Sequence, residues 1–235
     1  MKKAIIFDMD GVLVNSMPLH YRAMSIALKT ITNIDLDQRT FYLLEGMPVA
    51  EMALEIFKRK GYGINKDNLQ SIVEKIAQRK KEIFKQMNII PKPYDHVKEI
   101  INKELNNCLK AIVSGSSKHE VEVIIDKIFG KDKFDVIING DDFEGKGKPN
   151  PAPFKSAIDK LDIQFSSSSS SSSNNILIVE NSPLGVTAAN AAHIPSIVIL
   201  NNSPLEASDF TGIISRDKIF KNINSVKEYL KKWCN

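Results

Sequence analysis

A short apolar segment at the start of the chain ends in two aspartates and a glycine. Residues Lys3 to Phe7 are rich in Ile and Phe, which predicts a buried strand. Asp8 and Asp10 follow at once, and Gly11 comes next. Open α/β sheets form their ligand crevices beyond the carboxyl ends of their strands. The opening therefore predicts an α/β sheet whose first strand delivers two carboxylates to such a crevice.

The two aspartates point the same way if the segment is extended, because residues i and i+2 share one face of a strand. Neighbouring carboxylates repel each other unless a cation lies between them. Asp8 and Asp10 are therefore candidates for a hard-metal site and for a nucleophile or an acid/base pair. The alternative is that they are ordinary turn residues before Gly11, since Asp and Gly are common in turns.

Two different patterns follow along the rest of the 235 residues. From Ser16, a candidate helix cap, to about residue 88 the pattern is helical, with helices expected from Pro18, over 48–60 and from 65 or 67 to 86. The prolines at 91 and 93 break this pattern. Beyond them strands are expected at 109–113, 134–138, 176–179 and 196–200, and helices at 95–105, 118–129, 152–161, 183–192 and 226–233.

Alternating strands and helices imply a parallel sheet with helices on both faces. We therefore expect the α/β class, with a Rossmann-like parallel sheet core formed by residues 1–15 and 91–235. An all-helical cap domain, residues 16–90, is inserted after the first strand. Residues 166–173 are an unbroken serine run, for which we expect an exposed, flexible loop without a catalytic role. A phosphorylation or binding role for this run is the alternative.

Composition and charge restrict the class of protein further. The formal net charge of +4 is too small to indicate nucleic-acid binding. No apolar run is long enough to span a bilayer, and the first apolar stretch is too short for a signal peptide. Cys108 and Cys234 lie far apart without zinc-ligand spacing, which favours a reducing compartment over a disulfide scaffold. We therefore expect a cytoplasmic protein.

Ser114 ends the next predicted strand and is followed by Gly115 and Ser116. A serine hydroxyl and the free backbone amides at a helix start can together bind a phosphate. The alternative is that Ser116 or Ser117 simply caps the following helix, and both interpretations can hold together.

Two later segments add a fixed cation and further oxygen ligands. Prolines on the carboxyl side of Lys148 restrict the backbone there, which would hold a positive charge near the crevice. A solvated basic turn is the alternative. Glu180 and Asn181 follow a buried strand and offer oxygens suited to magnesium. Here the alternative is a plain helix start, capped by Ser182 and favoured by the acidic charge.

In their order and spacing these four segments resemble the four motifs of the haloacid dehalogenase superfamily of phosphohydrolases. The matching elements are Asp-x-Asp-Gly-Val, a strand-terminal Ser, Lys-Pro-x-Pro and an acidic residue before Ser-Pro. The resemblance covers nearly the whole chain, including the inserted helices. Within the superfamily the chain resembles the β-phosphoglucomutase-like branch of sugar-phosphate phosphatases and mutases. The run from Asp10 to Ser16, Leu-His-Tyr at 19–21 and residues 114–118 carry that narrower match.

The resemblance implies a role for each matching residue. Asp8 would attack phosphorus and form an aspartyl phosphate, and Asp10 would act as general acid and then general base. Ser114 and Lys148 would hold the transferring phosphoryl group. Other residues implied at the phosphate or substrate are Gly115, Ser116, His20 and Gly46. Mg²⁺ would bind Asp8, Asp10 through its carbonyl, and Asn181, with Glu180 close by.

The chain departs from the family pattern at two places. Asn181 stands where the family usually has a second acid, so the affinity for the metal is expected to be lower. The mutase branch has a basic residue, Gly and then Ser-Arg in a cap loop, where this chain reads Glu45-Gly46-Met47-Pro48-Val49. Cations that would hold the second phosphate of a bisphosphate are thus missing. His20, in contrast, matches a mutase-branch histidine that links cap closure to the acid/base aspartate.

These features together predict a Mg²⁺-dependent phosphatase of a small phosphorylated metabolite, a sugar or polyol phosphate, acting through an aspartyl-phosphate intermediate. We expect a monomer without nucleic-acid or membrane partners. The first alternative is a β-phosphoglucomutase-type mutase. A second, more remote alternative is a non-catalytic binding protein that keeps the fold.

Overall fold

A six-stranded, all-parallel sheet forms the centre of the computed structural model, which describes residues 2–63, 66–143, 146–163 and 175–235. The strand order is β3-β2-β1-β4-β5-β6. The strands span Lys3–Phe7 (β1), Cys108–Val113 (β2), Val136–Ile138 (β3), Ile176–Glu180 (β4), Ser196–Ile199 (β5) and Ile219–Phe220 (β6). The predicted α/β class is therefore confirmed. Strand β6 was not predicted, because two residues are too few to give a strand pattern in the sequence.

Helices cover both faces of the sheet. This explains why the sequence of β1 is apolar throughout. Ile5 and Phe7 belong to the core on one face, while Ala4 and Ile6 belong to the core on the other. A parallel strand buried on both sides reads as a continuous apolar run. The first core includes side chains of α5 (Val97–Glu99), η1 (Ile100–Glu104), α6 (Lys118–Ile128) and α9 (Ile223–Cys234); the second includes side chains of α7 (Ala152–Leu161) and α8 (Pro183–Ala191).

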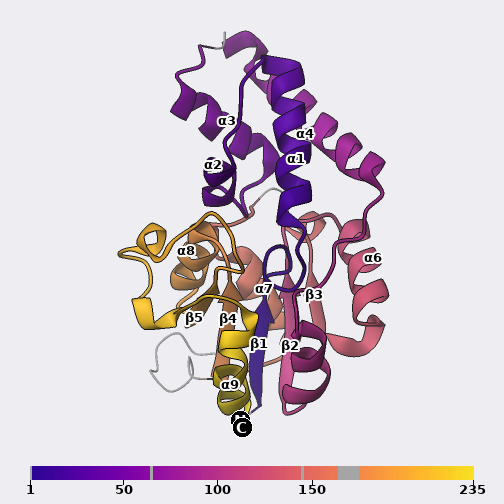
Figure 1. The fold of residues 1–235 in the computed structure, drawn as a ribbon, viewed down its shortest axis with the longest axis vertical. Coiled ribbons are helices and arrows are strands. Elements are labelled where there is room, and N and C mark those ends of the chain that lie inside the picture. The colour runs from indigo at the N-terminus through magenta and orange to yellow at the C-terminus, as the bar shows by residue number, and fades with distance from the viewer. Residues whose placement is uncertain (1, 64–65, 144–145, 164–174) are drawn as a thin grey trace.

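Four of the helices between β1 and β2 stand at one end of the sheet (Figure 1). They are α1 (Met17–Thr32), α2 (Gln38–Leu43), α3 (Val49–Lys60) and α4 (Lys66–Met87). Three were predicted, and α2 was missed because its six residues are too few to show a helical period. Gly61 ends α3 with φ at 62°, as expected for a glycine at a helix end. The chain passes twice between this block of four helices and the sheet, once before α1 and once after α4. The two connecting segments are hydrogen-bonded to each other, with the Asn15 backbone N–H donating to the Lys92 carbonyl oxygen at 2.8 Å.

The block also contacts the rest of the molecule away from these crossings. Arg39 of α2 donates to the Pro204 carbonyl at 3.0 Å and to Asp209 at 2.5 Å. The apolar core of the helices continues into Val198 and Phe210. The division into a cap of residues 16–90 and a core of residues 1–15 and 91–235 stays a prediction. The serine run at 166–173 lies outside the described residues.

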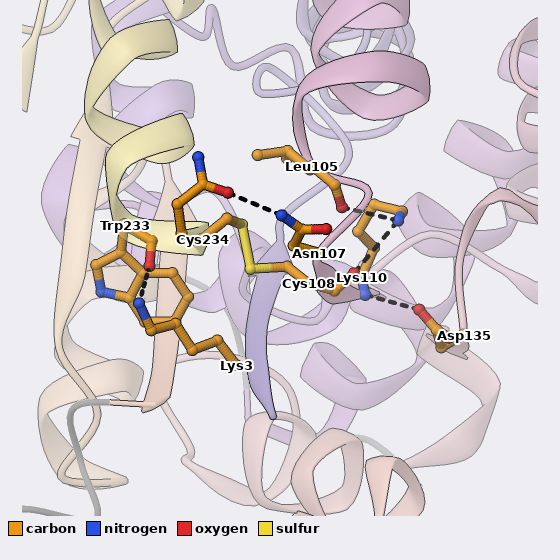
Figure 2. Close-up of a disulfide and its surroundings, with 9 residues drawn as sticks. Lys3, Leu105, Asn107, Cys108, Lys110, Asp135, Trp233 and Cys234 are labelled. Carbon is orange, nitrogen blue, oxygen red and sulfur yellow. Dashed lines mark hydrogen bonds between the residues drawn. A yellow bond between two sulfur atoms is a disulfide. The ribbon is translucent and has the colours of Figure 1, made fainter. Parts of the chain in front are cut away.

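The two cysteines are not free, which corrects the sequence expectation. Cys108, at the start of β2, and Cys234, at the end of α9, form a disulfide with their Cα atoms 5.6 Å apart (Figure 2). Next to it, Lys3 Nζ donates to the Trp233 carbonyl at 2.6 Å. A separation of 126 residues gives no sequence signal for such a pairing, since only the folded topology brings the two ends together. The cysteines therefore give no support to a reducing compartment, and a cytoplasmic location stays a prediction.

In the part of the chain that the structure describes, no helix is both long and apolar enough to cross a membrane.

Candidate active site

The predicted site residues meet at the carboxyl edge of three neighbouring strands. Asp8 and Asp10 follow β1, Ser114 follows β2, and Glu180 ends β4 with Asn181 next to it. The register aligns Phe7 of β1 with the ends of both neighbouring strands, so these polar side chains start from the same edge. All five side chains are buried. This is the crevice position that open parallel sheets use for ligands.

Lys148 is the buried cation of this edge. Its Nζ lies 2.5 Å from Oδ1 of Asp8 and 2.6 Å from Oε1 of Glu180. Burial raises the pKa of Asp8 well above its ordinary value, and Lys148 opposes that rise only in part. Burial would lower the pKa of Lys148, but the surrounding carboxylates outweigh it and raise this pKa above its ordinary value. The ammonium group therefore stays charged, which suits it to hold an anionic group beside Asp8.

Asp10 accepts hydrogen bonds from hydroxyls and an imidazole. Ser16 Oγ lies 2.5 Å and His20 Nε2 3.1 Å from its Oδ1, while the hydroxyls of Ser114 and Ser116 each donate to its Oδ2 at 2.9 Å. Burial alone would raise the pKa of Asp10. The His20 ring and the hydroxyls of Ser16 and Ser114 outweigh burial, so the pKa lies well below its ordinary value. Asp10 is thus held as a carboxylate in a fixed orientation.

A lysine from the inserted helices reaches the other side of the His20 ring. Nζ of Lys80, on α4, lies 3.2 Å from His20 Nδ1. An ammonium group only donates, so His20 Nδ1 accepts this hydrogen bond and the Nε2–H faces Asp10. The ring also stacks on Phe84, with ring centroids 4.2 Å apart. The charge run at 79–81 reads as a solvated face, but Lys80 is half-buried and oriented inward, and its lowered pKa has burial as the main cause.

The loop after α2 brings a third carboxylate to Lys148. Glu45 is buried, and its Oε2 has no hydrogen-bond partner. Gly46 follows with φ at 92°, and a Cβ there would lie 3.0 Å from Lys148 side-chain carbons. Only glycine lets this loop come so close to Lys148. Burial raises the pKa of Glu45 to about 7, against the pull of Lys148.

Several buried oxygens on this edge could hold a metal. Asp8 Oδ2 and Asn181 Oδ1 are buried without a hydrogen-bond partner. Asn181 also reaches the Asp10 carbonyl oxygen, with its Nδ2 at 3.0 Å. Carboxylate, amide and carbonyl oxygens are the ligands that Mg²⁺ prefers, so these residues fit that ion. Among the described residues no three His, Cys, Asp or Glu side chains form a metal cluster, so a metal here would rely on Asn181 and the carbonyl.

A cavity of about 260 Å³ opens beside Asp10, between the sheet edge and the inserted helices. Asp10, Gly115 and Ser116 line it from the sheet side. Glu45 and Gly46 line it from the helical side. Its walls include His20 and Lys80 as well. Four of the seven residues predicted at the phosphate or substrate, namely His20, Gly46, Gly115 and Ser116, thus border one space, whereas Asp8, Ser114 and Lys148 do not line it.

The structure differs from the sequence expectations in the partners of particular residues. Ser16 makes no side-chain cap bond and donates to Asp10 instead. Of the two cap candidates, Ser117 is the N-cap of α6, as one of the alternatives predicted, and its N–H donates to Glu120 at 3.0 Å. Ser114 Oγ donates to Asp10, and Glu180 pairs with Lys148. Whether Ser114 also holds a phosphate and Glu180 a metal stays a prediction.

Sequence reasoning missed two contacts of this site. Ser16 on Asp10 and Lys80 on His20 were not anticipated. The only sequence signal for Ser16 is its position six residues after Asp10, and Lys80 gives none, because 60 residues separate it from His20.

A scan against protein families matches residues 5–199 to the haloacid dehalogenase-like hydrolases. The chain belongs to this family. A phosphorylated carbohydrates phosphatase of Thermotoga maritima is 26% identical over 236 residues, which cover 97% of this chain and all of that protein. A hydrolase structure from Pseudomonas syringae gives a TM-score of 0.80 at 18% identity, covering 98% of this chain and 99% of that one.

A β-phosphoglucomutase structure from Clostridium difficile gives a TM-score of 0.71 at 20% identity, over the whole of this chain and 98% of that one. Structural likeness at such identity shows the fold alone. The haloacid dehalogenase-like membership predicted from the four motifs is confirmed, and the chain is an enzyme of this hydrolase family.

Proposed function

We propose that this chain is a Mg²⁺-dependent phosphatase that hydrolyses a small phosphorylated metabolite, a sugar or polyol phosphate, through an aspartyl-phosphate intermediate. One observation carries the proposal: two buried carboxylates on one strand end have opposite environments. Asp8 lies against Lys148, while Asp10 is held by hydroxyls and His20. The similarity to a phosphorylated carbohydrates phosphatase supports the choice of substrate class.

The first step is attack by the Asp8 carboxylate on the phosphorus of the ester. The bond from phosphorus to the alcohol oxygen breaks as the aspartyl phosphate forms, and the departing alkoxide takes a proton from Asp10. Lys148, 2.5 Å from Asp8, neutralises charge on the phosphoryl group. Mg²⁺, held by Asp8, the Asp10 carbonyl and Asn181, would supply further positive charge that reduces repulsion between carboxylate and phosphate.

The second step returns Asp8 to its starting state. Asp10 takes a proton from water, whose oxygen attacks phosphorus, and the bond between phosphorus and Asp8 breaks to release inorganic phosphate. The depressed pKa of Asp10 favours this basic role in the empty site. Its acidic role in the first step requires that the negative charge of a bound phosphate raise the pKa of Asp10.

We also propose that residues 16–90 act as a cap over the cavity. Lys80 of α4 and His20 of α1 connect this block to Asp10, so closure of the helices and orientation of the acid/base group would occur together. We propose a monomeric enzyme without macromolecular partners. A cytoplasmic location stays a proposal from the sequence alone, since the Cys108–Cys234 disulfide is more typical of oxidising compartments.

A β-phosphoglucomutase-type mutase is the second candidate, favoured by the 3.1 Å contact of His20 with Asp10. A mutase must hold the second phosphate of its bisphosphate intermediate. Glu45 occupies the position at which the resemblance leads us to expect a cation for that phosphate, which favours the hydrolase.

The experiment is release of inorganic phosphate from a panel of sugar and polyol monophosphates. We expect release by the wild-type protein with Mg²⁺, and loss of release in EDTA that is restored by excess Mg²⁺. Release by Asp8→Asn equal to that of the wild type would contradict the mechanism.

A further inference from the structure

Glu45 is a buried carboxylate at the cavity that the proposed mechanism does not use. It is 9% exposed, and its Oε2 is buried without a partner. An acceptor with no donor in a buried position costs free energy unless a ligand supplies the donor. Glu45 also borders the cavity beside Asp10. Glu45 is thus a carboxylate at the wall of this cavity, with one oxygen that no protein donor satisfies.

The position of Glu45 relative to the reaction follows from its neighbours. The adjacent Gly46 lies against Lys148, which is in turn 2.5 Å from Asp8. In the proposed mechanism the leaving alcohol takes its proton from Asp10, which borders the same cavity as Glu45. The carbon portion of the substrate then lies within reach of the loop that carries Glu45.

The charges around the cavity have an excess of carboxylates. Six ionisable Lys, Asp and Glu residues line it: Asp10, Glu45, Glu120, Asp141, Lys80 and Lys81. Of the two lysines, Lys80 already donates to His20, and Lys81 is exposed. A second anionic group on the substrate would meet more negative than positive charge here, whereas hydroxyl groups would find acceptors.

We propose that Glu45 is a specificity-determining residue that selects phosphate monoesters of neutral polyhydroxy alcohols and disfavours substrates with a second anionic group. Its carboxyl oxygens accept hydrogen bonds from substrate hydroxyls, and its charge repels a carboxylate or a second phosphate. This inference rests on the proposed phosphatase function and narrows its substrate class.

The test compares kcat/KM at pH 8, above the pKa of about 7 that burial gives Glu45, within two matched pairs of esters. One pair is glycerol 3-phosphate and 3-phosphoglycerate, and the other is glucose 6-phosphate and 6-phosphogluconate. We expect the wild-type protein to prefer the neutral member of each pair by about tenfold or more. Glu45→Gln, which keeps the shape, should reduce this preference several-fold, and Glu45→Lys should abolish or reverse it, mainly through KM.

Glu51 supplies the matched control, because it is an exposed glutamate in the first turn of α3 that does not border the cavity. Glu51→Gln and Glu51→Lys should leave the preference unchanged. If Glu45→Lys does not fold, the near-isosteric Glu45→Gln decides the question. A thermal melt of each variant confirms that the measured ratio belongs to folded protein.

Two results would overturn the inference, and they differ from failure of the proposed function. The inference is wrong if the wild type prefers the acidic esters, or if both folded Glu45 variants keep the wild-type ratio. If the wild type shows no Asp8-dependent hydrolysis of any ester, the proposed function itself falls, and the inference with it.

Discussion

Nζ of Lys148 lies 2.5 Å from Oδ1 of Asp8, and both side chains are almost fully buried. Replacing Lys148 by Met removes the charge but keeps much of the volume. We expect kcat/KM to fall by about 100-fold or more, because the phosphoryl group loses its fixed cation. The free energy of unfolding should fall by about 3 kcal/mol, because the partner carboxylates lose their buried counter-charge.

Lys155→Met is the control for this variant, since Lys155 is exposed on α7. Lys155→Met should change neither kcat/KM nor the free energy of unfolding noticeably. Wild-type turnover by Lys148→Met would show that this lysine does not act on the phosphoryl group.

Asp8→Asn tests the nucleophile. The amide keeps the size of the side chain but cannot form the aspartyl phosphate, so turnover should fall by about 10³-fold or more. The free energy of unfolding should change by less than about 2 kcal/mol, because burial already disfavours the charged form of Asp8. Phosphate release and urea unfolding measure the two effects, with Asp126→Asn on the exposed face of α6 as the control.

The pH dependence of stability should depend on Glu45. Burial raises the pKa of Glu45 from 4.5 to about 7 in the folded protein. Between these values the folded state keeps a proton that the unfolded state has lost, so this group makes the protein less stable as the pH rises from 5 towards 7. Glu45→Gln removes that loss.

We therefore expect Glu45→Gln to be more stable than the wild type at pH 8, by on the order of 2 kcal/mol, and nearly equal to it at pH 5. Urea unfolding at both pH values measures the difference. Equal stability of the two proteins at both pH values, as expected for the control Glu51→Gln, would contradict the assigned burial of the Glu45 carboxylate.

The disulfide between Cys108 and Cys234 should stabilise the protein without affecting turnover. It closes a loop of 126 residues, for which the chain-entropy account gives about 4–5 kcal/mol. Cys108 begins β2 whereas the site lies beyond its other end, so the chemistry should not respond. Dithiothreitol, or the variant Cys234→Ser, should lower Tm by about 10–20 °C, while phosphate release at 25 °C stays the same. Titration of two free thiols in the unreduced protein would contradict the pairing.

The sequence predicted most of the fold because apolar runs and prolines are local signals. β1, the glycine end of α3 and the sheet class all followed from short stretches of residues. The sequence predicted the site only as a set of candidate residues, because each motif lies at the end of a different strand. Contacts across long separations had no local signal: Lys80 reaches His20 from 60 residues away, and Cys108 meets Cys234 from 126 residues away. Without such a signal, the sequence pattern places the Lys80 side chain in solvent and predicts two free cysteines.

The measurement that tests the central claim most directly is phosphorus NMR of the purified protein. The sample contains Mg²⁺, β-glucose 1-phosphate and a trace of glucose 1,6-bisphosphate, and a parallel sample contains Asp8→Asn. We expect the signal of inorganic phosphate to grow with the wild type and to stay absent with Asp8→Asn. Growth of glucose 6-phosphate without free phosphate would contradict the hydrolase and establish the mutase.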